Sequence, residues 1–397
     1  MKVRNFFLMA LAASMALVSC DKSENDLSAP TDTQLKSVTI KLPNLTSPSS
    51  IGSRAVGDAM TTAANRTATL ENFKVIFLAG ETEMYAPTYD ADGDGTAEAQ
   101  TVYFSGDNIP TEITYHFLDA RIDRVVVVGN LGNVTYAQIT GTGNQATQSI
   151  LNDADGNHPL YPLYGEDNLE LKVPAPSTDD DEHENVYEAS VSLAPKMSRF
   201  EIVAAGYVQD GDEEPEFESL ELNKIALNNY YTDYTFTTGL GKTKAPACPT
   251  TAQVWDWIDN ATQADAIMSN AETSAKITVG LGKHVNIGTG VELTDTELGS
   301  SALGDGFENI ITYGVAGVSA ATDNPELLLS FYGVNGTAKT PLYVKAKFTS
   351  GSAFTAGKIY RVKFTITDGS WAQPERCVEL TVEPVDWVVE VLTPTFD

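Results

Sequence analysis

The chain has 397 residues, of which 42% are hydrophobic and 20% charged, so it is too apolar for an unfolded acidic polymer and long enough for two or three domains. Its 25 basic and 54 acidic residues give a formal net charge of −29, which repels phosphate backbones and excludes nucleic-acid binding. Four histidines and three cysteines leave few ligands for zinc, haem or iron–sulfur clusters, which makes these metal centres poor hypotheses.

Residues 1–19 have the layout of a secretory signal, with a short basic start and then an apolar run from Phe6 to Val18. At about 1.5 Å per helical residue, this run is too short for the ~30 Å hydrocarbon core of a bilayer, so we expect cleavage. The run ends in Leu17-Val18-Ser19-Cys20, which resembles the bacterial lipobox and predicts a lipid on Cys20. We therefore expect a lipid-anchored outer-membrane precursor. An ordinary signal peptide with a coincidental cysteine is the alternative.

The first ordered element follows a polar stretch, residues 20–36, which suits a tether between the lipid and the folded body. Val38, Ile40 and Leu42 then alternate with polar residues. This period of two predicts a half-buried strand at the start of the N-terminal domain.

A Pro- and Ser-rich loop at residues 43–57 contains the Arg54-Ala55 bond. The composition of this loop disfavours regular structure, so the bond is expected to be exposed and extended. An Arg-specific or trypsin-like surface protease needs such a bond. Cleavage after Arg54 would detach residues 20–54, a segment that includes the lipid and, in residues 37–54, the first strand and the cleavage loop.

Beyond this loop the chain is a succession of short strand patterns with almost no helical periodicity. The expected strands are 73–78, 102–104, 113–117, 125–128, 186–193, 200–207, 220–227, 230–236, 277–281, 328–332, 342–348, 359–366 and 378–382. Strands without intervening helices favour an all-β fold of antiparallel sandwiches. One helical pattern, at 252–268, predicts a small helical insertion. We place a domain boundary near Pro195, between an N-terminal domain at 37–195 and a C-terminal domain at 196–397.

One acidic cluster has the spacing of a calcium loop, because Asp90, Asp92 and Asp94 alternate with small residues. A complete EF-hand is excluded, since Thr101 stands where the bidentate glutamate belongs. The alternative is a hairpin tip in which Asp and Gly supply the turn geometry. Calcium is the one metal that the sequence suggests, and no other cofactor is expected.

Two cysteines remain once Cys20 carries lipid, namely Cys248 and Cys377. An exported protein meets an oxidising compartment, so a disulfide between them is one alternative. Two unrelated buried thiols are the other, and the sequence leaves both open.

The sequence contains no complete motif of the common enzyme classes considered below. The stretch Gly239–Thr243 lacks the first glycine of a phosphate-binding loop, because Phe236 stands at that position. The four histidines are scattered, and the chain has no Gly-x-Ser-x-Gly elbow. We therefore predict no catalytic residues and no enzyme.

Several segments taken in order carry a resemblance to a known family. They are Val125–Gly132, a strand and turn; Lys196–Val203, an alternating strand after an arginine; and Gly357–Phe364 with Glu379–Val391, two closing strands. With the lipobox and Arg54, these segments resemble the fimbrillins of Bacteroidetes, the type V pilins, over nearly the whole chain.

The resemblance implies two tandem transthyretin-like sandwich domains, export as a lipoprotein, proteolytic maturation on the cell surface and assembly into fimbriae used for adhesion. A sandwich that loses one strand exposes unpaired backbone groups, and a strand from another subunit can fill the gap. The expected partners are copies of this chain or sibling pilins, and the processing protease. The sequence does not identify a host or bacterial surface ligand.

A candidate donor strand lies in the tail at residues 385–397, where Trp387, Val389 and Val391 share one face. Burying three large side chains would contribute roughly 5–9 kcal/mol before entropy losses, at ~1.5–3 kcal/mol each. The alternative is an ordinary last strand that completes its own domain.

The main rival to a structural pilin is a monomeric surface lipoprotein that binds glycans with exposed aromatic side chains. A surface hydrolase is a third hypothesis, and it would require a clustered acid–base site. Cleavage after Arg54 followed by polymerisation distinguishes the pilin from both.

Overall fold

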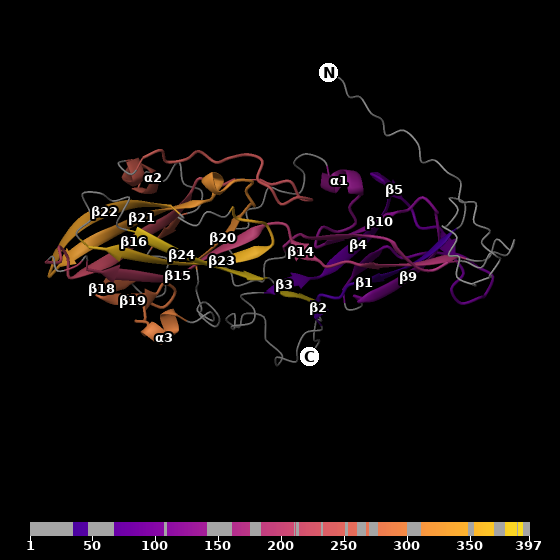
Figure 1. Cartoon of the computed structure of the whole chain (residues 1–397), viewed down its shortest axis with the longest axis horizontal. Helices are drawn as coiled ribbons and strands as arrows, with labels where there is room; N and C mark the ends of the chain where they lie inside the picture. The colour runs from indigo at the N-terminus through magenta and orange to yellow at the C-terminus, as the bar shows by residue number, and fades with distance from the viewer. Residues whose placement is uncertain are drawn as a thin grey trace, which may run out of the picture.

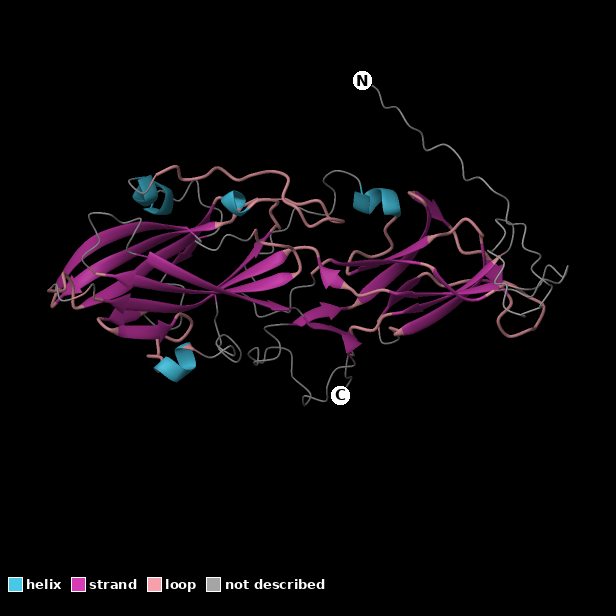
Figure 2. Cartoon of the chain, in the orientation of Figure 1, coloured by secondary structure: helices cyan, strands magenta, loops and turns pink. Residues whose placement is uncertain are grey.

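The computed structural model describes residues 35–46, 67–106, 109–140, 161–174, 184–209, 211, 214–231, 233–250, 253–259, 267–269, 277–299, 311–347, 353–368, 378–386 and 388–391. Strands dominate these residues and the helices are few and short (Figure 2). The expected all-β fold class is therefore confirmed. Two groups of sheets lie end to end along the long axis of the molecule (Figure 1).

The first half of the chain forms two sheets. Their strands are β1 (Lys36–Lys41), β4 (Asn72–Ala79), β5 (Thr82–Met84), β8 (Tyr103–Ser105), β9 (Glu112–Leu118), β10 (Arg124–Gly129), β11 (Leu163–Asn168), β12 (Glu170–Val173), β13 (Asn185–Ser190) and β14 (Ala194–Pro195). One sheet has the order β12-β13-β1-β9, and the other has the order β14-β11-β10-β4-β5, with β8 also paired to β4. Val125–Val128 in β10 are all fully buried, because this central strand is covered on both faces.

The second half forms two further sheets. Their strands are β15 (Ser198–Val208), β16 (Ser219–Asn228), β17 (Ile267–Ser269), β18 (Thr278–Gly280), β19 (Lys283–Asn286), β20 (Ile311–Val315), β21 (Glu326–Asn335), β22 (Ala338–Lys347), β23 (Lys358–Thr367) and β24 (Val378–Asp386). One sheet has the order β19-β15-β23-β24 with β20 paired to β15, and the other has the order β17-β16-β21-β22 with β18 paired to β16. The transthyretin-like arrangement of the two halves stays a prediction.

A small sheet connects the two ends of the chain. It consists of β2 (Leu45–Thr46), β3 (Thr67–Leu70) and β25 (Val388–Val391), in the order β2-β25-β3. A separate pair is formed by β6 (Thr88–Tyr89) and β7 (Glu98–Ala99). The last described strand of the chain therefore lies against strands of the first half.

Among the described residues, helices are limited to α1 (Tyr136–Thr140), α2 (Val254–Asp259), α3 (Asp295–Leu298) and a 3₁₀ turn, η4 (Ala321–Asp323). The helix expected over 252–268 is wrong at its C-terminal end. There Ile267–Ser269 pair as strand β17 with β16, and this long-range pairing overrides the local helical periodicity. Within the described ranges no helix has both the length and the apolar character needed to cross a membrane.

Two large clusters of buried residues form the cores of the two halves. Along the chain, buried hydrophobic residues up to Met197 belong to the first cluster, and the second cluster begins at Phe200. The first cluster also takes in Tyr234 and Phe236 from the second half. The ring of Phe236 meets that of Tyr164 edge-on, with centroids 5.6 Å apart. A loop of the second half therefore anchors the two halves to each other.

Candidate functional site

Strand β1 lies inside its sheet, between β13 and β9, and not at an edge. It pairs in parallel with β13, from Lys36 opposite Asn185 to Lys41 opposite Ser190, and antiparallel with β9. We call the position that β1 fills between these two strands the acceptor slot, and we call β13 and β9 its walls. Removing β1 would leave two unpaired strand edges that face each other.

The inner face of β1 is apolar and fully packed. Val38 and Ile40 are 0% exposed and Leu42, just beyond the strand, is 1% exposed. All three belong to the core cluster of the first half. Their burial is the main stabilising contribution of this segment, and it confirms the strand that the alternating pattern predicts.

The outer face of β1 is polar and makes matched contacts with both neighbouring strands. The hydroxyl oxygens of Thr39 and Thr114 lie 3.0 Å apart. Lys41 Nζ donates to Glu188 Oε2 at 2.6 Å. This hydrogen bond raises the pKa of Lys41 and lowers that of Glu188, and Glu112 adds a weaker attraction for the lysine.

Lys36, at the start of β1, is held by a second set of contacts. Its Nζ donates to the carbonyl oxygen of Ile122 at 2.5 Å and lies 4.7 Å from the centroid of the Tyr187 ring. Arg121 holds the pKa of Asp119 at about 2 through a hydrogen bond, and the charge of Lys36 adds to this effect. Both lysines of β1 therefore meet groups that favour a cation.

The predicted cleavage bond, Arg54-Ala55, lies outside the described residues. The strands on either side of it are described, because β2 ends at Thr46 and β3 begins at Thr67. The intervening segment thus connects two strands of the same small sheet, which are separated only by β25. A cut after Arg54 would separate β1 and β2 from the rest of the chain.

The predicted donor tail divides between two sheets. Val385 and Asp386 end β24, which pairs with β23. Val389 and Val391 lie in β25, which pairs in parallel with β2 and with β3. Trp387 lies outside the described residues. The backbone of the tail therefore reaches the first half within the same chain.

The acidic cluster forms an exposed turn. One carboxylate oxygen each of Asp90, Asp92 and Asp94 lie within 4.8 Å of one another. Asp90 accepts hydrogen bonds from the backbone N–H of Gly93 at 2.7 Å and of Gly95 at 2.9 Å. These bonds suit a hairpin tip, and calcium binding by the three carboxylates stays a prediction.

The thiol of Cys248 is buried. Its Sγ donates to the carbonyl oxygen of Thr250 at 3.2 Å, and burial raises its pKa. Cys377 and the predicted lipidation site Cys20 lie outside the described residues, so the disulfide and the lipid both stay predictions.

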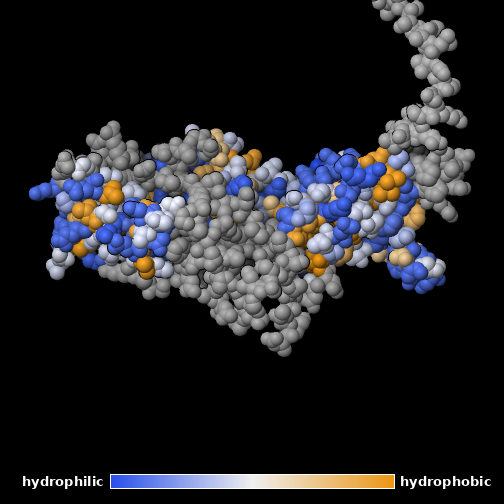
Figure 3. All heavy atoms as spheres, turned by 60° about the horizontal axis from the view of Figure 1, so that its bottom comes forward, coloured by the Kyte–Doolittle hydropathy of each residue, from blue (hydrophilic) through white to orange (hydrophobic). Residues whose placement is uncertain are grey.

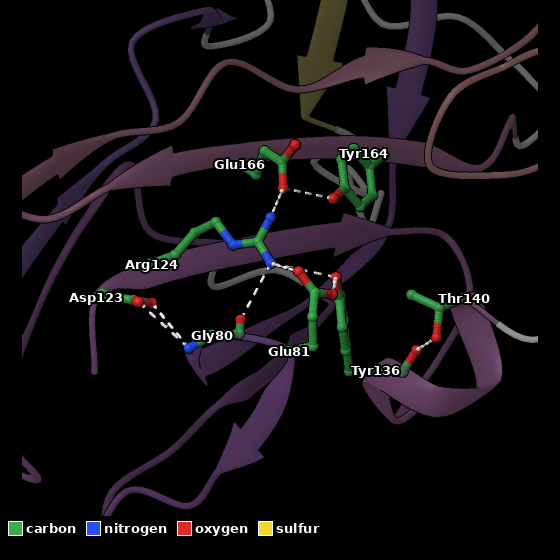
Figure 4. A network of polar contacts seen from close by, with 8 residues as sticks. All are labelled: Gly80, Glu81, Asp123, Arg124, Tyr136, Thr140, Tyr164 and Glu166. Atoms are coloured by element: carbon green, nitrogen blue, oxygen red, sulfur yellow. Dashed lines mark hydrogen bonds and ion pairs between the residues drawn. The ribbon is translucent and has the colours of Figure 1, made fainter. Parts of the chain in front are cut away.

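A charged network on the first half is internally satisfied (Figure 4). Arg124 donates to Glu166 at 3.0 Å and to Glu81 at 2.9 Å. The hydroxyl of Tyr164 donates to Glu166 at 2.9 Å, and that of Tyr136 donates to Glu81 at 2.8 Å. Because both terminal nitrogens of the guanidinium are engaged by the protein itself, the network serves to join strands and offers no anion site.

One group of side chains superficially resembles a hydrolase triad. His116 Nδ1 lies 2.9 Å from Glu184 Oε2 and 3.5 Å from Ser37 Oγ. A relay needs the carboxylate and the hydroxyl on different ring nitrogens, whereas here both face Nδ1. This arrangement therefore lacks the geometry of acyl-transfer catalysis.

Exposed aromatic side chains, which a glycan binder would use, are scattered over the described residues. Tyr85 is 81% exposed and Trp255 is 49% exposed. Tyr85 follows β5 in the first half and Trp255 lies in α2 in the second, far apart in Figure 1. Hydrophilic residues cover most of the described surface in Figure 3, with small hydrophobic patches between them. Tyr85 and Trp255 do not form one shared aromatic platform.

The contacts of Lys36 and Lys41 around the acceptor slot are not predictable from the sequence alone. The alternation of β1 shows that Lys41 faces outward, but the identity of its neighbour depends on pairing with β13, which is almost 150 residues away in the chain. The sequence signal for these contacts is the lysine at each end of β1, Lys36 and Lys41.

No protein family model matches the chain, and no curated protein matches it. Solved structures do match it. A candidate cell adhesion protein from Bacteroides eggerthii shares 13% identity with a TM-score of 0.44, and the match covers 91% of this chain and 99% of that one. A candidate cell adhesion protein from Parabacteroides distasonis shares 11% identity with a TM-score of 0.46, over 93% of this chain and 100% of that one.

A fimbrial anchor protein from Porphyromonas gingivalis is also similar, with 9% identity and a TM-score of 0.31, over 89% of this chain and 98% of that one. These three solved structures are adhesion and fimbrial proteins of Bacteroidetes, the group that the sequence resemblance names. At these identities the likeness concerns the fold alone.

Proposed function

We propose that the chain is a structural pilin that is exported as a lipoprotein, cut after Arg54 and joined to other subunits by strand exchange. The observation that carries this proposal is the position of β1. This strand precedes Arg54 in the sequence, yet it fills the middle of a sheet with fully buried side chains. Excision of residues 20–54 would empty the acceptor slot while both of its walls remain.

The position of the tail supports the same function. β25 pairs with β2, which would leave with the excised segment, and with β3, which would stay. Cleavage would therefore take away one of the two strands that hold the tail in its own chain. A tail with Trp387, Val389 and Val391 on one face is suited to enter an apolar slot in another subunit.

The energetics favour a filled slot. Emptying it uncovers the positions of Val38, Ile40 and Leu42, and burial of three such side chains contributes roughly 5–9 kcal/mol at ~1.5–3 kcal/mol each. A donor strand also replaces the backbone hydrogen bonds to β13 and β9. Exchange should therefore yield long-lived assemblies that dissociate slowly.

The test is to treat purified, unlipidated protein with an Arg-specific protease and to follow cleavage and oligomer size together. We expect oligomer ladders only after cleavage following Arg54. The double variant Arg54→Ala/Arg66→Ala, which removes both arginines between β2 and β3, is expected to leave a monomer, whereas Arg66→Ala alone is the matched control and should assemble as the wild type does. Truncation after Asp386, which keeps β24 whole, should abolish the ladders.

Two results would contradict the pilin model. One is assembly of Arg54→Ala/Arg66→Ala at the wild-type rate. The other is retention of the 20–54 segment after complete cleavage, even with a large excess of a peptide that carries the sequence of residues 35–46. Either result would favour the glycan-binding lipoprotein, which needs neither cleavage nor exchange.

Salt is expected to accelerate assembly between copies of this chain. Residues 1–54 carry six basic and four acidic residues, so the totals of 25 and 54 become 19 and 50 and the net charge becomes −31. Screening over a Debye length of about 10 Å at 0.1 M reduces the repulsion between such subunits. Light scattering at increasing sodium chloride concentration measures the rate, and a rate that falls with salt would contradict this prediction.

A further inference from the structure

The strands on either side of the acceptor slot carry charged side chains that bear on which donor could fill it, if the proposed strand exchange takes place. Lys36 and Lys41 sit five positions apart on β1, and each meets a defined set of partners on the walls. Lys41 faces Glu188 at 2.6 Å, with Glu112 close enough to attract it. When β1 leaves, these carboxylates stay behind on β13 and β9.

The chain's own tail does not supply the missing cations. Residues 387–397 contain no lysine or arginine and carry two acidic side chains, Glu390 and Asp397. Aligning Trp387, Val389 and Val391 with Val38, Ile40 and Leu42 places Glu390 at the position of Lys41. A like charge would then lie directly opposite Glu112 of β9 and diagonal to Glu188 of β13, which is unfavourable.

A shift of the tail by two residues along the acceptor slot does not supply the missing cation either. It would bring Val388 to the position of Lys41, which again lacks a cation. It would also draw Val385 and Asp386 into the slot, although both are already paired in β24. In either register the inner positions of the tail are apolar, and its residue at the position of Lys41 is not a cation.

We infer that the preferred occupant of the acceptor slot is the donor strand of a different pilin chain, with a basic side chain at the position of Lys41, and not the tail of a second copy. Such a donor repeats the pattern of β1, with apolar residues at the positions of 38, 40 and 42 and basic residues at those of 36 and 41. The chain would then join to a sibling subunit more readily than to itself. Charge complementarity of this kind acts chiefly on partner choice and association rate.

The test compares self-assembly of four full-length variants after cleavage following Arg54. Glu390→Lys in the tail and Glu188→Lys in the slot should each raise the rate of self-assembly about 3- to 10-fold, because each brings opposite charges together across neighbouring strands. The double variant should lose much of this gain, since two lysines then lie diagonally across the strand pair. Glu214→Lys is the matched control, because it makes the same change in net charge at an exposed position in the second half of the chain.

A peptide measurement makes the result independent of the tail. A labelled peptide of residues 35–46 should displace the excised segment about 3- to 10-fold more effectively than the same peptide with Lys41→Glu, and Glu188→Lys in the protein should reverse this order. If Glu390→Lys and Lys41→Glu change nothing while ladders still form, strand exchange holds and charge selection is overturned. If no strand of any sequence enters the slot, the proposed function fails and this inference fails with it.

Discussion

Ile40→Ala is expected to lower the free energy of unfolding of the uncut precursor by about 2–5 kcal/mol. Ile40 is 0% exposed in the interior strand β1, so truncation leaves a cavity between two packed sheets. Urea unfolding measures the loss, and hydrogen exchange in β9 and β13 localises it. Thr39→Ala is the matched control on the opposite face of the strand, and it should cost less than about 1 kcal/mol.

Whether the stability loss of Ile40→Ala persists after cleavage and assembly distinguishes a pilin from a monomeric glycan-binding lipoprotein. The substituted residue leaves with the excised segment if strand exchange occurs, so assembled Ile40→Ala protein should be as stable as assembled wild type. In a monomeric lipoprotein the residue stays, and the loss persists under every condition. If the full loss in the free energy of unfolding persists after cleavage and assembly, the strand-exchange model is wrong.

Gly239→Ala is expected to destabilise the protein by about 2–4 kcal/mol through two separate effects. Gly239 has a φ of +72°, a conformation that costs an L-residue about 1–3 kcal/mol. A Cβ there would also lie 2.7 Å from the carbonyl oxygen of Lys196 and collide with the side chain of Ala356. The loop that carries Gly239 also carries Phe236 into the core of the first half, so the joint between the halves should loosen.

Gly282→Ala distinguishes the two effects. Gly282 has a φ of +69°, but nothing lies within 4 Å of the position that its Cβ would take. This control should cost only the backbone term, about 1 kcal/mol. Chemical denaturation with tryptophan fluorescence measures both variants. Equal losses in the two would show that Gly239 is not sterically constrained at the joint.

Local patterns were sufficient to predict β1 as a strand, because the alternation of Val38, Ile40 and Leu42 is a property of consecutive residues. The neighbours of β1 were not predictable in this way. Its parallel pairing with β13 depends on a segment almost 150 residues later, and no local signal encodes such a distance. The charged contacts of the acceptor slot follow from this pairing and were missed for the same reason.

At residues 230–236 the local pattern predicts a strand that the structure does not form. Tyr231 and Tyr234 make only isolated bridges, to Lys244 and Gly241. Tyr234 is buried in the core of the first half, and so is Phe236. The apolar pattern is therefore real, but it serves the contact between the halves and does not build a sheet, a distinction that periodicity cannot make.

The mixed pairing of β1 has one more consequence. One wall of the acceptor slot is parallel to its occupant and the other is antiparallel, so a donor strand satisfies both ladders in one orientation only. Every junction built in this way therefore points the same way. Because the donor and acceptor surfaces are different, the contact is heterologous, and it propagates as an open filament unless a rotation closes it. Such a fibre has two unlike ends, one with an open slot and one with a free tail, and a subunit that lacks either feature would cap it.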